Sequence, residues 1–513
     1  MFSDKDIKQI ETKGLTVEKV NEQISVFKKG FPYAQIIRGA VKGDGIKVLS
    51  DSEKENYINK YESITKNNQF LKFVPASGAA SRMFKNLFAF ISEYQKEDYT
   101  AFSKKEKFED VYDFFKSLEN FAFYEDLSQT LENEGLHIAE IQLKQEYKTI
   151  LKALLTEEGL NYGNLPKGLL KFHKYPEGPR TPVEEHMVEG CNYAANQDGT
   201  VAIHFTVSPE HQQNFEEHVA KVAPVYEKKY GKKISVTYSV QKPSTDTIGV
   251  TPENEPFRNP DGTILFRPGG HGALIENLGE LDADIIIIKN IDNVTHDRFK
   301  QETFDYKKVL TGVLDDYKER IHNYMHLLKG DKVSGSVISE ISDFLKEELC
   351  IEPRGKNENR EEAIAYFKRK LNRPIRVCGM VKAEGDTGGG PFWVKNSDGT
   401  TSLQIVESAQ IDLKDPFFKE IYDQATHFNP VDIACCIKDY KNRKFDLKDF
   451  VDYDAGFISN KSKDGKDLKA LELPGLWNGS MANWISIFVE VPLITFNPVK
   501  KVNDLLKDTH QPS

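Results

Sequence analysis

The sequence is poor in cysteine and contains no long apolar segment. Five of its 513 residues are cysteine, none forms a CxxC pair, and Cys435 and Cys436 are adjacent. Because adjacent cysteines make a poor disulfide, we expect reduced thiols and a cytoplasmic protein. No apolar run approaches the roughly 20 residues of a membrane-spanning helix, so no membrane contact is expected. The opening MFSDKDIKQIETKG has no apolar core of a signal peptide.

An excess of positive charge is also absent. The chain has 69 Lys and Arg residues against 79 Asp and Glu residues, a net charge of −10. This balance argues against nonspecific binding to nucleic acid, so the cations for any anionic ligand must be gathered locally. There is no internal repeat, and NSDGTTS and NKSKDGKD have the composition of solvated turns. The sequence leaves the oligomeric state open.

Hydrophobic periodicity divides the chain into three expected parts. Residues 1–68 form a mostly helical N-terminal segment, and residues 69–412 an α/β domain. That domain contains a helical insertion at 84–160 and a further helical segment at 305–372. Residues 413–513 form a C-terminal segment that completes the site.

Strand-like runs alternate with helical stretches from about residue 200 onward. The runs TVAIHFTVS, KISVTYSVQ, TILFRPGG and ADIIIIKNIDNV are rich in β-branched residues and end at turn-forming residues. Such alternation predicts a mainly parallel sheet with helices on its faces.

A stretch of small residues, FVPASGAASRMFK, follows the first expected strand. Small residues let backbone N–H groups approach a phosphate, and the helix that follows adds its positive end. Arg82 could then bind phosphate oxygens with two hydrogen bonds. The alternative is a plain strand-to-helix turn with a solvated arginine. The residues of the loop that would bind nucleotide are Ala76, Ser77, Gly78, Ala79 and Ser81.

Two lysines come shortly after a proline at other turns. Lys167 lies between Pro166 and Gly168, where it could act as a point charge for phosphate, and Lys500 lies in FNPVKKVNDLL. The alternative for both is an ordinary surface lysine. In RTPVEEHMVEG, Thr181 is expected to cap a helix.

A glycine loop and an acidic strand end lie between these lysines. Gly269, Gly270 and Gly272 would let backbone touch a base or a phosphate. The apolar strand 285–288 leads to Asp292, a position where open α/β sheets bind ligands and where a carboxylate could hold Mg²⁺. The alternative is that Asp292 caps the next turn.

The order of these motifs resembles the uridylyltransferase superfamily of UDP-sugar pyrophosphorylases, and in particular its bacterial DUF4301 branch. ASGAASRM, LPKG, PGGHGAL, IDN, VESAQ and FNPVKKVNDLL resemble the family motifs in order from about residue 70 to 506. The resemblance implies a GT-A, Rossmann-like nucleotidyltransferase fold, a mixed sheet flanked by helices. It also implies uridine contacts at Gln241, Gly270, His271 and Gly272, and sugar contacts at Asn293, Glu407 and Asn478.

The resemblance implies that a sugar 1-phosphate attacks the α-phosphorus of UTP and releases pyrophosphate, with Mg²⁺ on Asp292 and with Arg82, Lys167 and Lys500 as the catalytic cations. Positioning and charge neutralisation dominate such reactions. The sequence departs from the family at Ser77 and Ala80, which replace glycines, and in the spacing of Arg82 and Lys167, which are 85 positions apart. The alternatives are a non-catalytic sugar-nucleotide binding protein and a GT-A glycosyltransferase.

Overall fold

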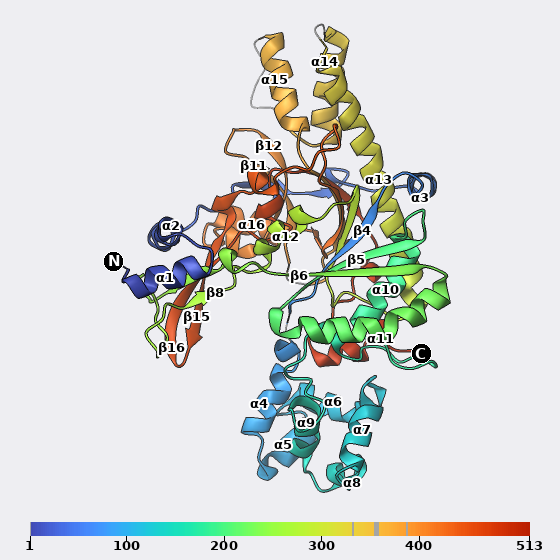
Figure 1. Ribbon diagram of the computed structural model, residues 1–513, viewed down its shortest axis with the longest axis vertical. Helices are drawn as coiled ribbons and strands as arrows, with labels where there is room; N and C mark the ends of the chain where they lie inside the picture. Colours follow the sequence, from blue (N-terminus) through green and yellow to red (C-terminus); the bar gives the residue numbers. More distant parts are fainter. Residues whose placement is uncertain (1, 79, 331–332, 353–358, 386–387, 513) are drawn as a thin grey trace. The chain divides into compact units, whose positions relative to one another are not determined.

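The computed structural model describes residues 2–78, 80–330, 333–352, 359–385 and 388–512 (Figure 1). The chain forms two compact units. Unit 1 comprises Met1–Phe70, Val240–Ile288 and Lys307–Leu493, and unit 2 comprises Leu71–Ser239, Lys289–Tyr306 and Ile494–Ser513. The division into 1–68, 69–412 and 413–513 stays a prediction.

Unit 1 is built on a mixed sheet whose strands follow the order β2-β3-β17-β10-β14-β9, with β13 paired to β10. β3 and β10 both pair with β17 in parallel, whereas β14 is antiparallel to β10. All five residues of β9 are buried, in agreement with the apolar run in the sequence. The strands are β2 (Val41–Lys42), β3 (Gly45–Lys47), β9 (Ile285–Lys289), β10 (Ile375–Lys382), β13 (His427–Phe428), β14 (Asp432–Cys436) and β17 (Ile485–Glu490).

Two smaller antiparallel sheets complete the strands of unit 1. One has the order β1-β11-β12 and the other the order β15-β16-β7-β8. NSDGTTS contains the turn between β11 and β12 and the first two residues of β12. NKSKDGKD contains the end of β15, a hairpin turn and the start of β16, so its turn is shorter than its composition suggests. The strands are β1 (Ile36–Gly39), β7 (Thr247–Val250), β8 (Phe266–Arg267), β11 (Gly390–Lys395), β12 (Thr401–Val406), β15 (Phe457–Lys463) and β16 (Lys466–Glu472).

Except for α12, the helices that lie wholly in unit 1 begin at a residue whose side chain caps them. Thr16 caps α2 by accepting a hydrogen bond from the Lys19 N–H, and Gly30, with φ of +76°, follows its last residue. The helices are α1 (Asp4–Thr12), α2 (Val17–Lys29), α3 (Asp51–Ile64), α12 (Leu274–Glu280), α14 (Gly335–Asp343), α15 (Arg360–Leu371) and α16 (Pro416–Asp423). A longer helix, α13 (Lys300–Leu327), begins in unit 2 and ends in unit 1.

Unit 2 carries the strands β4 (Phe70–Pro75), β5 (Thr200–Val207) and β6 (Lys233–Val240) in that order. β4 and β5 are parallel, with Val74 opposite Phe205. Helices α10 (Pro182–Tyr193) and α11 (Gln212–Tyr230) belong to the same unit. Thr181 caps α10 with Pro182 at its first position, as the sequence predicts.

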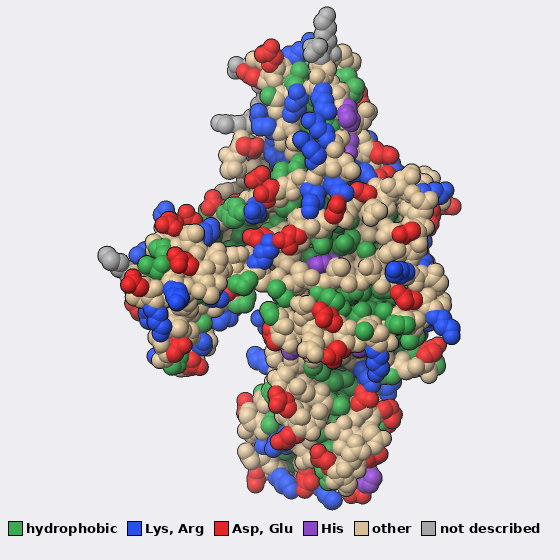
Figure 2. All heavy atoms as spheres, in the orientation of Figure 1, with side chains coloured by type: hydrophobic (Ala, Val, Ile, Leu, Met, Phe, Trp, Pro, Cys, Tyr) green, Lys and Arg blue, Asp and Glu red, His purple; other side chains and the backbone are tan. Residues whose placement is uncertain are grey.

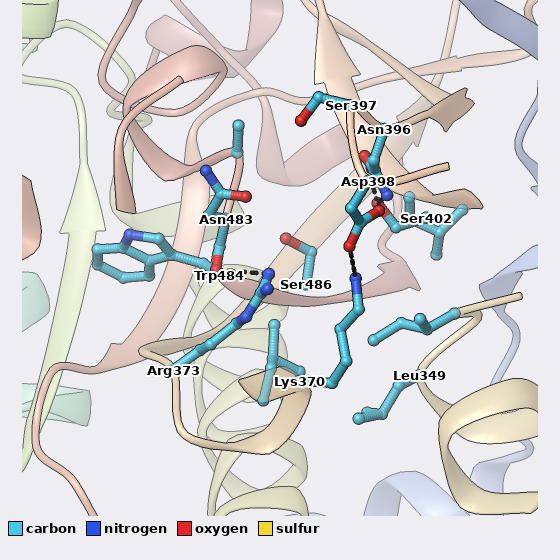
Figure 3. Close-up of a pocket in the computed structure, with 14 residues that line it drawn as sticks. Leu349, Lys370, Arg373, Asn396, Ser397, Asp398, Ser402, Asn483, Trp484 and Ser486 are labelled. Atoms are coloured by element: carbon cyan, nitrogen blue, oxygen red, sulfur yellow. Dashed lines mark hydrogen bonds and ion pairs between the residues drawn. The ribbon is translucent and has the colours of Figure 1, made fainter. Parts of the chain in front are cut away.

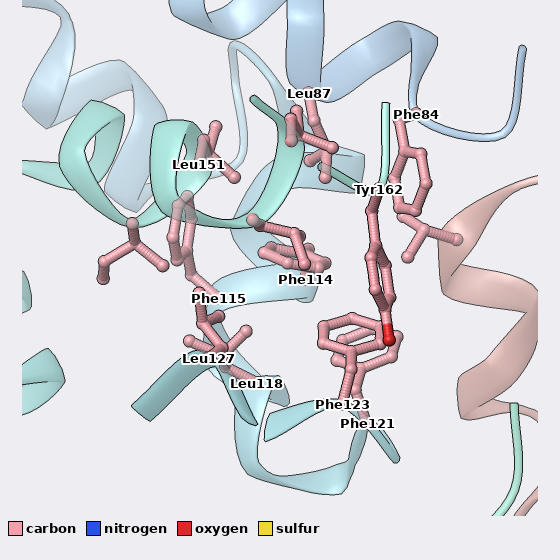
Figure 4. Close-up of a cluster of buried hydrophobic side chains, with 14 of the residues drawn as sticks. Phe84, Leu87, Phe114, Phe115, Leu118, Phe121, Phe123, Leu127, Leu151 and Tyr162 are labelled. Carbon is pink, nitrogen blue, oxygen red and sulfur yellow. The ribbon is translucent and has the colours of Figure 1, made fainter. Parts of the chain in front are cut away.

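The expected helical insertion is present and has a core of its own (Figure 4). Aromatic rings fill this core, among them Phe90, Phe114 and Phe121, all fully buried. Val499, Val502 and Leu505, far along the chain, belong to the same cluster. The insertion is therefore completed by a distant segment of unit 2. Its helices are α4 (Lys85–Glu93), α5 (Tyr99–Ser103), α6 (Glu109–Lys116), α7 (Tyr124–Glu132), α8 (Ile138–Leu143) and α9 (Tyr147–Leu155).

The mixed α/β fold expected from the sequence is confirmed. On the face that Figure 2 shows, acidic and basic side chains are intermixed. No helix within the described part of the chain is long and apolar enough to cross a membrane.

Candidate functional site

The small-residue loop of unit 2 follows β4, as the sequence predicts. The Ala76 N–H donates to the Thr206 carbonyl at 2.8 Å, which continues the strand pairing by one residue. Ser77, Gly78 and Ser81 are exposed, so their backbone and hydroxyl groups are open to a ligand. Ala79 lies outside the described residues.

Ala80, which replaces a family glycine, has its side chain in the core of the insertion. It is fully buried within that cluster, and its N–H donates to the Leu165 carbonyl at 3.2 Å. The extra methyl group therefore packs against apolar side chains. The alanine at this position therefore attaches the loop to the core of the insertion.

The two ends of the insertion meet at this loop. The Lys167 N–H donates to the Gly78 carbonyl at 3.3 Å, beside the bond from Ala80 to Leu165. The chain between Arg82 and Lys167, which are 85 positions apart, thus returns to the loop that it leaves.

Lys167 lies against two other predicted site segments of unit 2. Its ammonium group donates to Asp292 Oδ2 at 2.9 Å and to the Val499 carbonyl at 2.6 Å. Both charged side chains are mostly buried, 13% and 15% exposed. The Val499 N–H in turn donates to the Asp292 carbonyl at 3.1 Å. Three motifs that are distant in the sequence therefore meet at one point.

Lys500 follows Val499 and is exposed. Among the described residues, its ammonium group contacts no carboxylate within salt-bridge distance, so it is available to an anionic ligand. Asn293 is 2% exposed, and its side-chain carbonyl accepts a hydrogen bond from the Asn497 N–H at 2.8 Å. Asn293 thus fastens the segment that presents Lys500, and its role as a sugar contact stays a prediction.

Arg82 lines a cavity of about 210 Å³ together with Lys85 and Lys501. Asp110 of α6 faces the same cavity and contacts Lys501 at 3.3 Å. Asn503 donates to the Asp110 backbone carbonyl at 2.7 Å. Three cations beside one carboxylate make this cavity suited to a polyphosphate.

A fully buried group of charges lies along the strands that lead to these residues. Lys72 of β4 and Lys289 of β9 both contact Glu189 of α10, at 2.7 and 2.6 Å. The two ammonium groups hold the pKa of Glu189 well below its ordinary value, against the opposing effect of burial. His186 belongs to the same group and bonds through Nε2 to the Ile291 carbonyl at 3.2 Å. Sequence reasoning missed Lys72, Glu189 and Lys289, because a lysine within a strand carries no signal of its partner.

The glycine loop of unit 1 packs closely against a second loop. A Cβ atom on Gly269 would lie 2.6 Å from Leu473 Cδ1, and one on Gly272 would lie 2.0 Å from the Pro474 carbonyl oxygen. Gly270 has φ of +81°, a conformation that other residues rarely adopt. Gly270 is therefore required by its backbone conformation, and Gly269 and Gly272 are required because a side chain would not fit there.

His271 stacks on Trp477 with ring centroids 4.1 Å apart. The Leu476 N–H donates to His271 Nδ1 at 3.0 Å, so the neutral ring carries its proton on Nε2. Burial lowers the pKa of His271 to about 4. Trp477 is a residue that sequence reasoning missed, although it adjoins the predicted Asn478.

Glu407 and Asn478 complete this group. Asn478 Nδ2 donates to Glu407 Oε1 at 2.8 Å, and the same oxygen lies 3.8 Å from His271 Nε2. Burial raises the pKa of Glu407. The structure thus brings together predicted residues from three motifs of unit 1, a histidine, a carboxylate and an amide that can bind hydroxyl groups.

Gln241, the predicted uracil contact, lies in unit 1 after β6. Its Nε2 is buried and has no hydrogen-bond partner among the described residues. An unpaired buried amide is costly unless a ligand satisfies it.

No group of three or more His, Cys, Asp or Glu side chains in the described ranges could hold a metal ion by itself. Asp292 offers a single carboxylate. Such a donor fits Mg²⁺ that is shared with the phosphates of a substrate, because Mg²⁺ keeps few protein ligands in such sites.

We expect Gly272→Ala to lower the free energy of unfolding by about 1–3 kcal/mol, since the new methyl would overlap the Pro474 carbonyl. Denaturant unfolding of the purified variant measures the change. Gly335→Ala is the matched control, because a Cβ there meets nothing within 4 Å. Equal stability of the two variants would contradict the close packing of the loop.

Solved structures similar to this chain include UDP-glucose pyrophosphorylase from Leishmania major in complex with UDP-glucose, with 12% identity and a TM-score of 0.44 over 98% of this chain and 77% of that one. The uridine diphosphate N-acetylglucosamine pyrophosphorylase from Trypanosoma brucei has 11% identity and a TM-score of 0.45 over 95% and 74%. No curated protein matches. The family model described as "Domain of unknown function (DUF4301)" matches residues 3–511, so the chain belongs to the DUF4301 family.

Proposed function

We propose that the protein is a nucleotidyltransferase that forms a UDP-sugar and pyrophosphate from UTP and a sugar 1-phosphate. The observation that carries this proposal is the meeting of Lys167, Asp292 and Val499, which joins three motifs of the chain. Lys167 lies between the Asp292 carboxylate and the segment that carries Lys500. A lysine in this position is suited to neutralise the charge of reacting phosphates.

Each cation has a distinct task in this proposal. Arg82 and the backbone of residues 77–81 hold the β- and γ-phosphates, while Lys167 stabilises charge on the α-phosphate. Lys500 binds the phosphate of the incoming sugar. Asp292 would hold Mg²⁺, which neutralises phosphate charge when it is bound. A sugar phosphate is ionised at neutral pH, so no general base is required.

The residues of unit 1 supply recognition in this proposal. Gln241 and the backbone of 269–272 bind uracil, and Glu407 with Asn478 accepts and donates hydrogen bonds to sugar hydroxyls. His271 is neutral at pH 7 because its pKa is about 4, so it contributes a stacked, uncharged ring and an Nε2 donor.

The test is an assay of purified protein with Mg²⁺, UTP and a panel of sugar 1-phosphates, in which released pyrophosphate is measured. We expect pyrophosphate with at least one sugar. No pyrophosphate with any sugar or nucleoside triphosphate would reject the enzyme. UDP-sugar binding without turnover would then support a binding protein, and transfer of sugar from a UDP-sugar would support a glycosyltransferase.

A further inference from the structure

A cavity of about 250 Å³ in unit 1 lies at the start of β10 and β17 (Figure 3). These two strands are parallel and begin in register, with Ile375 opposite Ile485. None of the residues that line the cavity belongs to the predicted nucleotide or sugar contacts. The cavity adjoins that site, because Asn396, Ser397 and Asn483 also line the neighbouring pocket that contains Asn478.

Two cations and one carboxylate are the charged side chains that line this cavity. Lys370 is 6% exposed and contacts Asp398 at 2.7 Å, so these two charges compensate each other. Arg373 donates to the backbone carbonyls of Arg369 and Asn483, at 2.8 and 3.2 Å. Among the described residues, no carboxylate forms a salt bridge with Arg373. Arg373 therefore shares the nearby charge of Asp398 with Lys370, and the two cations outnumber this one carboxylate.

A third cation is hydrogen-bonded to a residue that lines the cavity. Arg376 is fully buried, and its Nε donates at 2.8 Å to the hydroxyl of Ser486, which lines the cavity. Its Nη1 donates to the Trp477 carbonyl at 2.6 Å, but its Nη2 has no partner in the described part of the chain. A buried guanidinium without a carboxylate is costly unless an anion lies nearby.

Neutral polar groups complete the lining. Asn396, Ser397, Ser402 and Asn483 offer hydroxyl and amide groups around the cations. Figure 3 shows the Lys370 and Arg373 side chains extending into the same space with Ser486 between them. Such groups are suited to the hydroxyls of a small polar molecule.

We propose that this cavity binds a small metabolite that carries a phosphate monoester. Lys370 and Arg373 of the lining, together with Arg376 behind Ser486, exceed the single carboxylate of Asp398 by two charges, which match the two negative charges of a phosphate monoester. The volume is below the 300–1,000 Å³ of typical ligand pockets, so the ligand is smaller than a nucleotide. Burial lowers the pKa of both Lys370 and Arg373, an effect that a bound anion would oppose.

Isothermal titration calorimetry with inorganic phosphate, glycerol 3-phosphate and glycerol tests the proposal on the full chain. We expect binding of at least one phosphate probe and none of glycerol. Tighter binding of glycerol 3-phosphate assigns the site to phosphate esters, and equal binding assigns it to free phosphate. The Lys167→Ala variant should bind the probes like the wild type, which separates this cavity from the proposed catalytic site.

Arg373→Gln should weaken phosphate binding about tenfold or more, because it removes a charge-assisted contact. Lys368→Gln is the matched control, since Lys368 is an exposed cation of α15, the helix that precedes Arg373, and does not line the cavity. Ser397→Asp adds a negative charge at an exposed position of the lining and should weaken binding without affecting the fold. No binding of either phosphate probe, or equal binding by Arg373→Gln, Ser397→Asp and Lys368→Gln, would overturn the proposal.

Discussion

Lys167→Ala is expected to lower the rate of pyrophosphate release about 10²–10³-fold, the usual effect of removing one group that stabilises transition-state charge. In the structure, the Lys167 ammonium group lies between Asp292 and the Val499 carbonyl, which precedes Lys500. No other ammonium group among the described residues makes both contacts. Initial rates with saturating UTP and sugar 1-phosphate measure the change.

Lys171→Ala is the control for this prediction. Lys171 lies in the same unit and pairs with Asp126, away from Asp292. Its replacement should leave the rate within about twofold, in line with the small energies of exposed ion pairs. Circular dichroism and thermal unfolding establish that both variants are folded. A folded Lys167→Ala variant with full activity would contradict the role proposed for Lys167.

Glu189→Ala is expected to lower the free energy of unfolding by about 3–5 kcal/mol, because it removes the carboxylate that both Lys72 and Lys289 contact. All three side chains are at most 1% exposed, so water does not replace the lost interactions. Urea unfolding at pH 7 measures the change. Glu217→Ala removes an exposed carboxylate of α11 that accepts from Gln213, and it should cost about 0.5 kcal/mol or less.

The effect of Glu189 also depends on pH. Its pKa in the folded protein lies well below the ordinary value of 4.5. Its contribution to stability is therefore present above pH 4.5 and is lost as the pH falls below that value. The difference in unfolding free energy between wild type and Glu189→Ala should shrink as the pH is lowered. A difference that stays constant down to pH 3 would show that Glu189 does not bear the charge assigned to it.

The sequence predicted the fold class and most elements that carry the site, because these depend on local signals. The apolar run that forms β9, the Thr181 cap of α10 and the helices of the insertion are read from neighbouring residues. The hairpin turns between β11 and β12 and between β15 and β16 were recognised as turns, while the strands of the second hairpin were missed because β15 is polar.

Interactions between distant residues could not be predicted. Lys72 and Glu189 are 117 positions apart, and Arg376 contacts Trp477 across 101 positions. Ala80 illustrates the same limit. In the sequence it is a departure from a glycine loop, and only the structure places its methyl group in the core of the insertion. The roles of the individual site residues stay predictions.

The core of the insertion has a consequence for the order of folding during synthesis. Its aromatic cluster includes Val499, Val502 and Leu505, which leave the ribosome long after residues 84–172. Until then the nascent chain exposes the apolar surface that these side chains later cover, a surface prone to association with chaperones. The segment that presents Lys500 is thus also the last part of this core to be synthesised, so the proposed catalytic cations come together only after that segment has left the ribosome.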